Sequence, residues 1–408
     1  HIQYCWAWTK LAIEPMHEAR RNRTSPARIL LVTRNFPPTH GGMERLMRHC
    51  YKELSGEFEL ALVGPTGCAS LPGINPATTL ECPLRTTLWS LVRFQYAAWR
   101  MARRFNPNIV MAGSGAMAPA CLVAARSVNA TVVGYVHGLD LVADNRIYQW
   151  LFVGALRRFD LLLANSRNTR RLADKATGLG DRIHVIHPGV SPVPSPTSNI
   201  TATFRQRHGL DERTPILLSV GRLTPRKGLA EFVGHALPYV VKELPECLLV
   251  IIGSEPDHAL QKNAGETTRI LNAASTHDLT KHLLFLGSVN DNTLHEALTA
   301  SDLMVFPVLD LPGDVEGFGM VALEASANGL PTVAFAAGGV PDAIEHGVSG
   351  YLIPAGDYRQ FAETIIRHLR GQDAAVWRER CRSFALAFSW DKFGVKLRTL
   401  CRDALKQH

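Results

Sequence analysis

The stretch PILLSVGRLTPRKGLAEFV, residues 215–233, contains the unit from which the chain is built. It begins with an apolar run of the kind found in strands that are buried on both faces of a parallel sheet. A turn with glycine and proline follows, and then a segment with the apolar spacing of a helix. The same order recurs from Arg28 onward, so the pattern predicts parallel strands joined by helices.

Apolar runs of this kind form two series. The first contains RILLVT, ELALVG, NIVMAG, TVVGYV, LLLANS and RIHVIHPG; the second contains PILLSVG, CLLVIIG, HLLFLG, LMVFPV, PTVAFA and GYLIPA. Between them, HPGVSPVPSPTSN holds four prolines, which disfavour helix and strand. We therefore expect an α/β fold with two doubly wound, Rossmann-like parallel-sheet domains facing a cleft.

At 408 residues the chain is too long for one hydrophobic core, which fits two domains. We predict a first domain at 26–190, a linker at 191–200, a second domain at 201–384, and a final helix at 385–408 that packs back on the first domain. Residues 1–25 are expected to be a disordered or added extension, because polar residues break their apolar run and it fits no secretory leader.

Positive charge is concentrated in the first half of the chain. Residues 1–190 hold 23 Lys and Arg against 12 Asp and Glu, a net +11, whereas residues 191–408 hold 21 against 24, a net −3. The first half is therefore suited to an anionic partner. No apolar run reaches the roughly 18 residues of a membrane-spanning helix. The scattered cysteines form neither CxxC pairs nor zinc-ligand spacings, so we expect a cytoplasmic protein without a metal site.

Two turns of the second series have the composition of an anion site. In SVGRLTPRKG, Arg222 and Lys227 follow a strand, where a planar guanidinium and a point charge can neutralise a diphosphate. In EGFGMVALEA, a Gly-x-Gly turn leads into a helix whose free amides and dipole favour an anion. Taken alone, either turn is better explained as a loop without a ligand, but both occur in one domain.

Glu316 and Glu324 flank the second of these turns. A carboxylate repels phosphate, but it accepts two hydrogen bonds from a vicinal diol. We therefore expect Glu324 to hold a ribose and Glu316 to reach the hydroxyls of a second sugar. The implied ligand is a nucleoside diphosphate sugar.

The first half contains two candidate partner sites. NFPPTHGGMERLMRHC runs from a strand through paired glycines into a helix and is a third turn suited to an anion. The segment 88–105 has a helical core face formed by Leu91, Phe94, Ala98, Met101 and Phe105.

The other face of segment 88–105 interleaves aromatic residues with arginines, namely Trp89, Tyr96 and Trp99 with Arg93, Arg100 and Arg104. This composition suits an anionic membrane surface or a lipid-linked acceptor. The alternative is that the aromatics pack beneath a loop and the arginines are merely solvated. No nucleic-acid-binding module is evident, so we expect no nucleic-acid partner.

From about residue 25 onward the chain resembles the retaining GT-B glycosyltransferases of family four, also called group 1. The motifs that carry the resemblance are HGGMER, VHGLD, NSRNTRRL, VIHPGV, SVGRLTPRKG, FLGSV, VEGFGMVALEASANGLPTVA and GGVPDAIEHGVSGYLIPAGD. The resemblance implies a GT-B fold in which the first domain binds the acceptor and the second binds the nucleotide sugar. DVEGFG is similar to the bacterial GDP-mannose-dependent members, which implies GDP-mannose as the favoured donor and a UDP-sugar as the alternative.

Matched position by position, the motifs imply catalytic roles for His137, Glu316, Arg222 and Lys227. They imply donor-binding roles for Gly41, Gly42, Gly253, Ser288, Val289, Phe318, Gly319, Met320, Val321 and Glu324. Acceptor or membrane contacts are expected at Glu44, Arg45, Arg93, Trp99 and Arg100. His187 is interpreted as structural. IIGSEPD departs from the family, which commonly has a second glycine after Gly253.

The resemblance implies retaining transfer of a hexosyl group, favoured to be mannosyl, by front-face substitution. The acceptor is expected to be lipid- or glycan-linked, in the synthesis of cell-envelope lipopolysaccharide or polysaccharide, with peripheral contact at the inner face of the cell membrane. No cofactor or metal is expected, because no Asp-x-Asp pair lies near the site. A nucleotide-sugar epimerase of the same fold and a non-catalytic nucleotide-sugar-binding protein remain alternatives.

Overall fold

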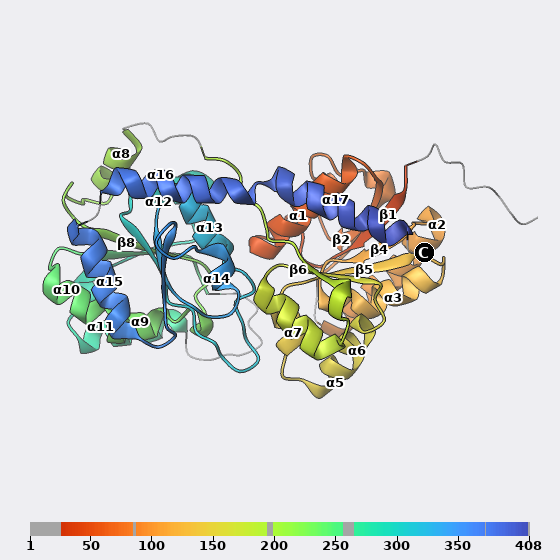
Figure 1. Cartoon of the computed structure of the whole chain (residues 1–408), viewed down its shortest axis with the longest axis horizontal. Helices are drawn as coiled ribbons and strands as arrows, with labels where there is room; N and C mark the ends of the chain where they lie inside the picture. Colours follow the sequence, from red (N-terminus) through yellow and green to blue (C-terminus); the bar gives the residue numbers. More distant parts are fainter. Residues whose placement is uncertain (1–25, 85–86, 194–198, 256–264, 372, 407–408) are drawn as a thin grey trace, which may run out of the picture.

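The computed structural model describes residues 26–84, 87–193, 199–255, 265–371 and 373–406. The expected extension at 1–25 lies outside the described residues, as do residues 194–198 of the expected linker. The described residues form two parallel-sheet α/β units that lie side by side (Figure 1). The predicted fold class is therefore confirmed.

The first sheet has seven strands in the order β3-β2-β1-β4-β5-β6-β7, and all neighbours are parallel. Its strands are β1 Arg28–Val32, β2 Glu59–Pro65, β3 Thr79–Cys82, β4 Ile109–Ala112, β5 Thr131–Val136, β6 Leu161–Ala164 and β7 Ile183–Val185. Its helices are α1 Gly42–Ser55, α2 Thr87–Phe105, α3 Ala118–Arg126, α4 Leu139–Val142, α5 Arg146–Tyr148, α6 Gly154–Leu156 and α7 Arg167–Thr177.

Strand β3 was not predicted from the sequence. It is an edge strand of four residues, and its Glu81 interrupts the apolar run on which the strand prediction relied. An edge strand needs less apolar character because only one neighbour and part of the core cover it.

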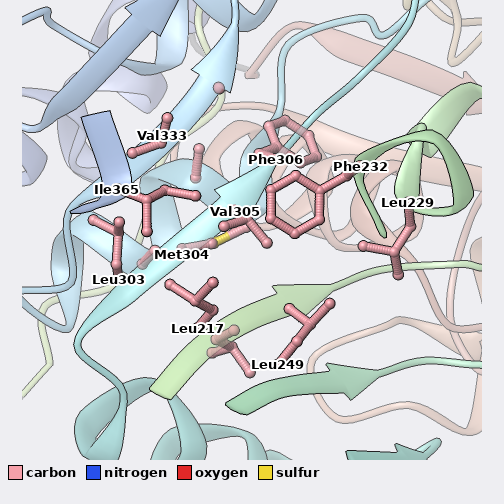
Figure 2. Close-up of a cluster of buried hydrophobic side chains, with 14 of the residues drawn as sticks. Leu217, Leu229, Phe232, Leu249, Leu303, Met304, Val305, Phe306, Val333 and Ile365 are labelled. Atoms are coloured by element: carbon pink, nitrogen blue, oxygen red, sulfur yellow. The ribbon is translucent and has the colours of Figure 1, made fainter. Parts of the chain in front are cut away.

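The second sheet has six parallel strands in the order β10-β9-β8-β11-β12-β13. They are β8 Ile216–Val220, β9 Leu248–Ile252, β10 Leu283–Gly287, β11 Leu303–Phe306, β12 Thr332–Phe335 and β13 Gly350–Ile353. The helices are α8 Asn199–Arg207, α9 Leu229–His235, α10 Leu237–Glu243, α11 Glu266–Thr276, α12 Asp291–Ala300, α13 Met320–Ala327, α14 Val340–Ala343, α15 Tyr358–Gly371 and α16 Ala374–Ala385. Figure 2 shows the buried core around β8, β9 and β11, including Leu217, Leu249 and Val305.

The last helix, α17 Trp390–Lys406, crosses to the first domain and lies along α1 (Figure 1). Its buried residues Phe393, Leu397, Cys401 and Ala404 belong to the core on that side of the first sheet. The crossing chain runs beside the other interdomain connection, because the Val190 amide donates to the Phe388 carbonyl at 2.7 Å. The two connections between the domains therefore lie side by side. The domain edges bearing α1, α7, α13 and α14 face each other (Figure 1).

Candidate active site

A cavity of about 290 Å³ lies between the two domains. We call it the interdomain cleft. Its first-domain wall is formed by residues 40–46 at the start of α1, with His137, Leu139 and Asn165. Its second-domain wall contains the turns after β8 and before α13. These turns follow the carboxyl ends of parallel strands, where ligands of doubly wound sheets bind.

The cleft brings together most of the residues predicted for the site. Its lining includes His137, Arg222, Lys227, Glu316, Glu324, Gly41, Gly42, Glu44, Arg45, Phe318, Gly319, Met320 and Val321. Gly253, Ser288 and Val289 are not among the lining residues, and neither are Arg93, Trp99 and Arg100.

The glycine turns of the two domains approach each other closely. Gly319 has φ 95° and precedes the first residue of α13, a backbone conformation that side chains other than glycine rarely adopt. Gly317 packs against the His137 carbonyl, leaving no room for a Cβ atom. A Cβ atom on Gly42 would lie 3.2 Å from Met320 Sδ. The positive end of α13 therefore opens into the cleft opposite the α1 turn.

Glu316 is held by two cations at the same oxygen. Lys227 Nζ lies 2.7 Å from Glu316 Oε2, and Arg226 donates to that oxygen as well. Arg226 Nε also lies 2.8 Å from Asp314 Oδ1. Burial would raise the pKa of Glu316, but Lys227 and Arg226 outweigh it and hold the pKa below its usual value. Glu316 is therefore an anion with one oxygen fixed.

Burial shifts the pKa of Lys227 downward, whereas it shifts that of a carboxylate such as Glu316 upward. The neighbouring Glu316 counteracts the effect of burial on Lys227. The Lys227 ammonium lies 4.8 Å from the centre of the Phe306 ring, a cation–π distance. Arg222 is exposed and lines the cleft wall, where its guanidinium is accessible to an anion.

Arg226 is a site residue that sequence reasoning missed. It is 9% exposed, and an arginine so buried requires paired charge. The only sequence signal was its position beside Lys227 in PRKG. Which carboxylates it reaches depends on the fold of the 310–316 loop, which local sequence does not fix.

Glu324 pairs with a residue of the other domain. Arg45 Nη2 lies 2.7 Å from Glu324 Oε1, and the carboxylate side chain is 16% exposed. Burial raises the pKa of Glu324, partly offset by Arg45. The sequence predicted Arg45 at the acceptor and Glu324 at the ribose. In the structure the two side chains bind each other across the cleft.

His137 is fixed in one orientation at the end of β5. Its Nε2 lies 2.8 Å from the Gly113 carbonyl, an arrangement in which Nε2 carries the proton. Its buried Nδ1 has no hydrogen-bond partner among the described residues. The Asp140 carboxylate accepts the amides of His137 and Gly138, each at 3.0 Å, and holds the turn. Asp140 was another residue that sequence reasoning missed, although it belongs to VHGLD.

The predicted base-side residues lie at the ends of β9 and β10, next to the cleft wall. Gly253 packs against the Gly221 carbonyl, where a Cβ atom would collide. Its amide donates to the Gly287 carbonyl at 2.8 Å. Ser288 Oγ is 2.9 Å from Ser254 Oγ, and Val289 packs on the second core. The strand ends therefore gather these residues, although none of the three lines the cavity itself.

Asp342 of α14 joins the two domains beside the cleft. It accepts the Arg167 amide at 2.6 Å, Arg167 Nε at 2.7 Å and His187 Nε2 at 2.9 Å. Burial would raise the pKa of Asp342, but the hydrogen bonds from His187 and Arg167 lower it overall. His187 thus contacts the second domain through Asp342. The sequence predicted only a structural role for His187 within the first domain.

Helix α2 lies away from the cleft and presents its aromatics to solvent. Trp89, Tyr96 and Trp99 are 75%, 59% and 41% exposed, and Arg93 and Arg100 are exposed beside them. The alternative that these aromatics pack beneath a loop is therefore wrong. Among the described helices, none is long and apolar enough to cross a membrane.

Comparison with known proteins agrees with this two-domain arrangement. Residues 40–193 match the family model "Glycosyltransferase Family 4", and residues 201–385 match "Glycosyl transferases group 1". The protein is a GT-B glycosyltransferase. The chain belongs to the group 1 glycosyltransferases, with a family 4 first domain.

One relative from Mycobacterium tuberculosis H37Rv is named "GDP-mannose-dependent alpha-(1-6)-phosphatidylinositol monomannoside mannosyltransferase". It is 29% identical over 92% of this chain and 98% of its own. Among solved structures, sucrose-phosphate synthase from Thermosynechococcus elongatus aligns with a TM-score of 0.76 at 20% identity, over 94% of this chain and 100% of that one. Anabaena HepE with UDP and glucose aligns with a TM-score of 0.74 at 19% identity, over 92% and 100%. At these identities the two structures support the fold alone.

Proposed function

We propose that this glycosyltransferase transfers a mannosyl group from GDP-mannose to a glycolipid acceptor of the cell envelope, with retention of configuration. The observation that carries the proposal is the charge pattern of the cleft. Two cations and a helix N-terminus lie beside two largely buried glutamates, an arrangement that fits a diphosphate between two sugars.

The donor would lie across the second-domain wall. Arg222, Lys227 and the amides at the start of α13 would bind the diphosphate, and Glu324 would accept the ribose hydroxyls in place of Arg45. The cations that hold Glu316 act on Oε2, so Oε1 would accept from the hexose hydroxyls. The base would lie toward Ser288, Val289 and Gly253.

In the transfer step, the bond between the anomeric carbon and the diphosphate oxygen breaks as the acceptor oxygen attacks from the same face. Arg222, Lys227 and the α13 amides stabilise the negative charge on the leaving diphosphate, which takes the acceptor proton. His137 contacts the transferred sugar. This chemistry uses residues of the chain and the donor itself, so the proposal includes no metal or other cofactor.

GDP and mannose are supported by the relatives' names. The Mycobacterium tuberculosis relative spans nearly the whole chain, and its printed substrate is a phosphatidylinositol monomannoside. A lipid acceptor also fits the outward face of α2, where tryptophans alternate with arginines. We therefore propose peripheral contact with an anionic membrane, at its cytoplasmic face.

A donor panel tests the proposal. Unfolding temperature is measured with GDP-mannose, UDP-glucose and ADP-glucose at equal concentrations. A ligand at a hundred times its Kd adds about 2.7 kcal/mol to the free energy of unfolding, so GDP-mannose is expected to give the largest shift. The Lys227→Gln variant serves as control and is expected to lose most of that shift. Equal shifts for the three donors would contradict the assignment of the base.

A further inference from the structure

The first domain holds a second cavity, of about 840 Å³, that the proposed donor site does not use. It is lined by residues 142–146, 149–151, 154 and 157–158, between the end of α4 and the helical segment from α5 to α6. We call it the α4–α6 groove. It begins where α4 ends, and α4 starts two residues after His137 of the cleft.

Internal hydrogen bonds give the groove a fixed shape. Gln149 Nε2 donates to the carbonyls of Leu141 and Ala143 at 3.1 and 3.0 Å, which ties the two walls together. Asn145 Oδ1 accepts the Tyr148 amide at 3.0 Å at the start of α5. Residues 149–153 form a π-helical turn, a rare local structure that is frequent at functional sites.

The groove carries uncompensated positive charge. Arg146, Arg157 and Arg158 line it together with one acidic residue, Asp144. None of the three arginines forms an ion pair with any residue in the described parts of the chain. Arg157 Nε donates to the Ala176 carbonyl at 3.1 Å, which fixes its guanidinium at the groove wall. An anion with several oxygens, such as a phosphodiester, fits guanidinium donors.

An apolar rim accompanies this charge. Trp150 is 79% exposed, Ile147 73% and Leu151 42%. Aromatic and aliphatic side chains left in solvent beside arginines are typical of a surface that meets the headgroup region of a lipid layer. Helix α3 contacts both α2 and the segment from η4 (Gln149–Val153) to α6, and its Val123 is 47% exposed. Helix α3 thus lies between the groove segment and α2.

We propose that the α4–α6 groove binds the phosphodiester headgroup of the lipid acceptor. The headgroup phosphate lies between Arg146 and Arg158, the acyl chains leave past Trp150 and Ile147, and the sugar hydroxyl extends along α4 to His137. This inference rests on the proposed function, because it assumes that the cleft performs the transfer. It assigns acceptor recognition to a site separate from Arg45 and from α2.

The test measures lipid binding without donor, so it does not depend on transfer. The probe is soluble dihexanoyl phosphatidylinositol, compared with dihexanoyl phosphatidylcholine and with inorganic phosphate. The wild-type chain is expected to prefer the phosphatidylinositol. The Arg146→Gln/Arg158→Gln variant is expected to bind the phosphatidylinositol about tenfold more weakly, because each arginine near a lipid phosphate contributes to the binding free energy. Trp150→Ala is expected to weaken the same binding severalfold.

The matched control is Arg213→Gln/Arg367→Gln, which removes two exposed arginines from the second domain and is expected to bind the lipid as wild type does. GDP binding is expected to be equal in all four proteins, which shows that they are folded. Unchanged lipid binding in Arg146→Gln/Arg158→Gln would overturn the proposal. So would binding of inorganic phosphate as tight as that of the lipid, since the groove would then be a site for free anions. Equal unfolding-temperature shifts for the three donors, together with normal lipid binding, would contradict the donor assignment but not the proposal that the groove binds the lipid headgroup.

Discussion

Among single residues, Glu316 is an anion with one carboxylate oxygen already bound by two cations. Lys227 and Arg226 hold Oε2, so the change Glu316→Gln removes the anion with little change in shape. We expect transfer to fall roughly tenfold to a hundredfold, the cost of losing a hydrogen bond to a charged group. GDP binding, measured by calorimetry, is expected to change much less, because GDP contains no hexose.

The control for Glu316 is Glu363→Gln, a substitution of an exposed glutamate on α15. It is expected to leave both transfer and GDP binding unchanged. Parallel losses of transfer and of GDP binding in Glu316→Gln would mean that Glu316 does not contact the sugar.

Glu324 is expected to give donor binding a dependence on pH. Burial raises the pKa of Glu324 above its ordinary value, and the form proposed to bind the ribose is the ionised one. As the pH falls through this raised pKa, the carboxylate is protonated and GDP-mannose binding is expected to weaken. Titration calorimetry across mildly acidic pH measures this loss. In Glu324→Gln the affinity is expected to be lower and its pH dependence flatter; an identical acid loss in that variant would assign the effect to another group.

The sequence identified those cleft residues that lie within short local motifs. Short motifs contain Glu316, Lys227 and the glycines before α13, so it could be predicted that these residues line one site. Arg226 and the Arg45–Glu324 pair could not be predicted, because each depends on which distant segment the fold brings opposite. Asp140 holds its own turn through the amides of His137 and Gly138, and VHGLD was the local signal for it. A buried arginine and an exposed one look alike in the sequence.

At the scale of elements, the cluster around Asp342 connects α14 to the start of α7 and to the end of the first domain. The pKa of Asp342 is lower in the folded protein than in the unfolded chain, so the ionised carboxylate stabilises the fold at neutral pH. This contribution to the free energy of unfolding disappears as the pH falls through the lowered pKa. We expect Asp342→Asn to reduce the free energy of unfolding at neutral pH by about 1–3 kcal/mol. The difference from wild type should shrink in acid.

Urea unfolding at neutral and acidic pH measures the effect. Asp181→Asn, at an exposed position of the first domain, is the control and is expected to leave stability unchanged. A difference between Asp342→Asn and wild type that stays constant with pH would exclude a role for the charge.

Helix α2 is the element proposed to meet the membrane. Arg93→Gln/Arg100→Gln removes two exposed charges without touching the buried face formed by Phe94, Ala98 and Met101. Sedimentation with vesicles of phosphatidylglycerol in phosphatidylcholine is expected to show about tenfold or more weaker binding, because each basic residue contributes about 1 kcal/mol at an anionic surface. Wild-type binding should also weaken with salt. Undiminished binding by the variant would place the membrane contact elsewhere.

At the scale of the whole molecule, the sequence predicted both sheets because buried parallel strands leave an apolar run that can be read directly. Of the thirteen strands that the described residues form, twelve correspond to such runs, and the exception, β3, is a short edge strand containing Glu81. The relative placement of the domains could not be predicted from strand patterns. It depends on side-chain pairs such as Arg167 with Asp342, and on the packing of α17 against α1.

Sugar transfer by the full chain tests the proposed function without an intermediate step. The full chain is incubated with GDP-mannose labelled in the mannose and with a phosphatidylinositol mannoside in mixed micelles, and label is measured in the extracted lipid. We predict labelled lipid with the new linkage in the α configuration, reduced in Glu316→Gln although that variant still binds GDP. Tight binding of GDP-mannose with no label in the lipid would contradict the proposed mannosyltransferase activity.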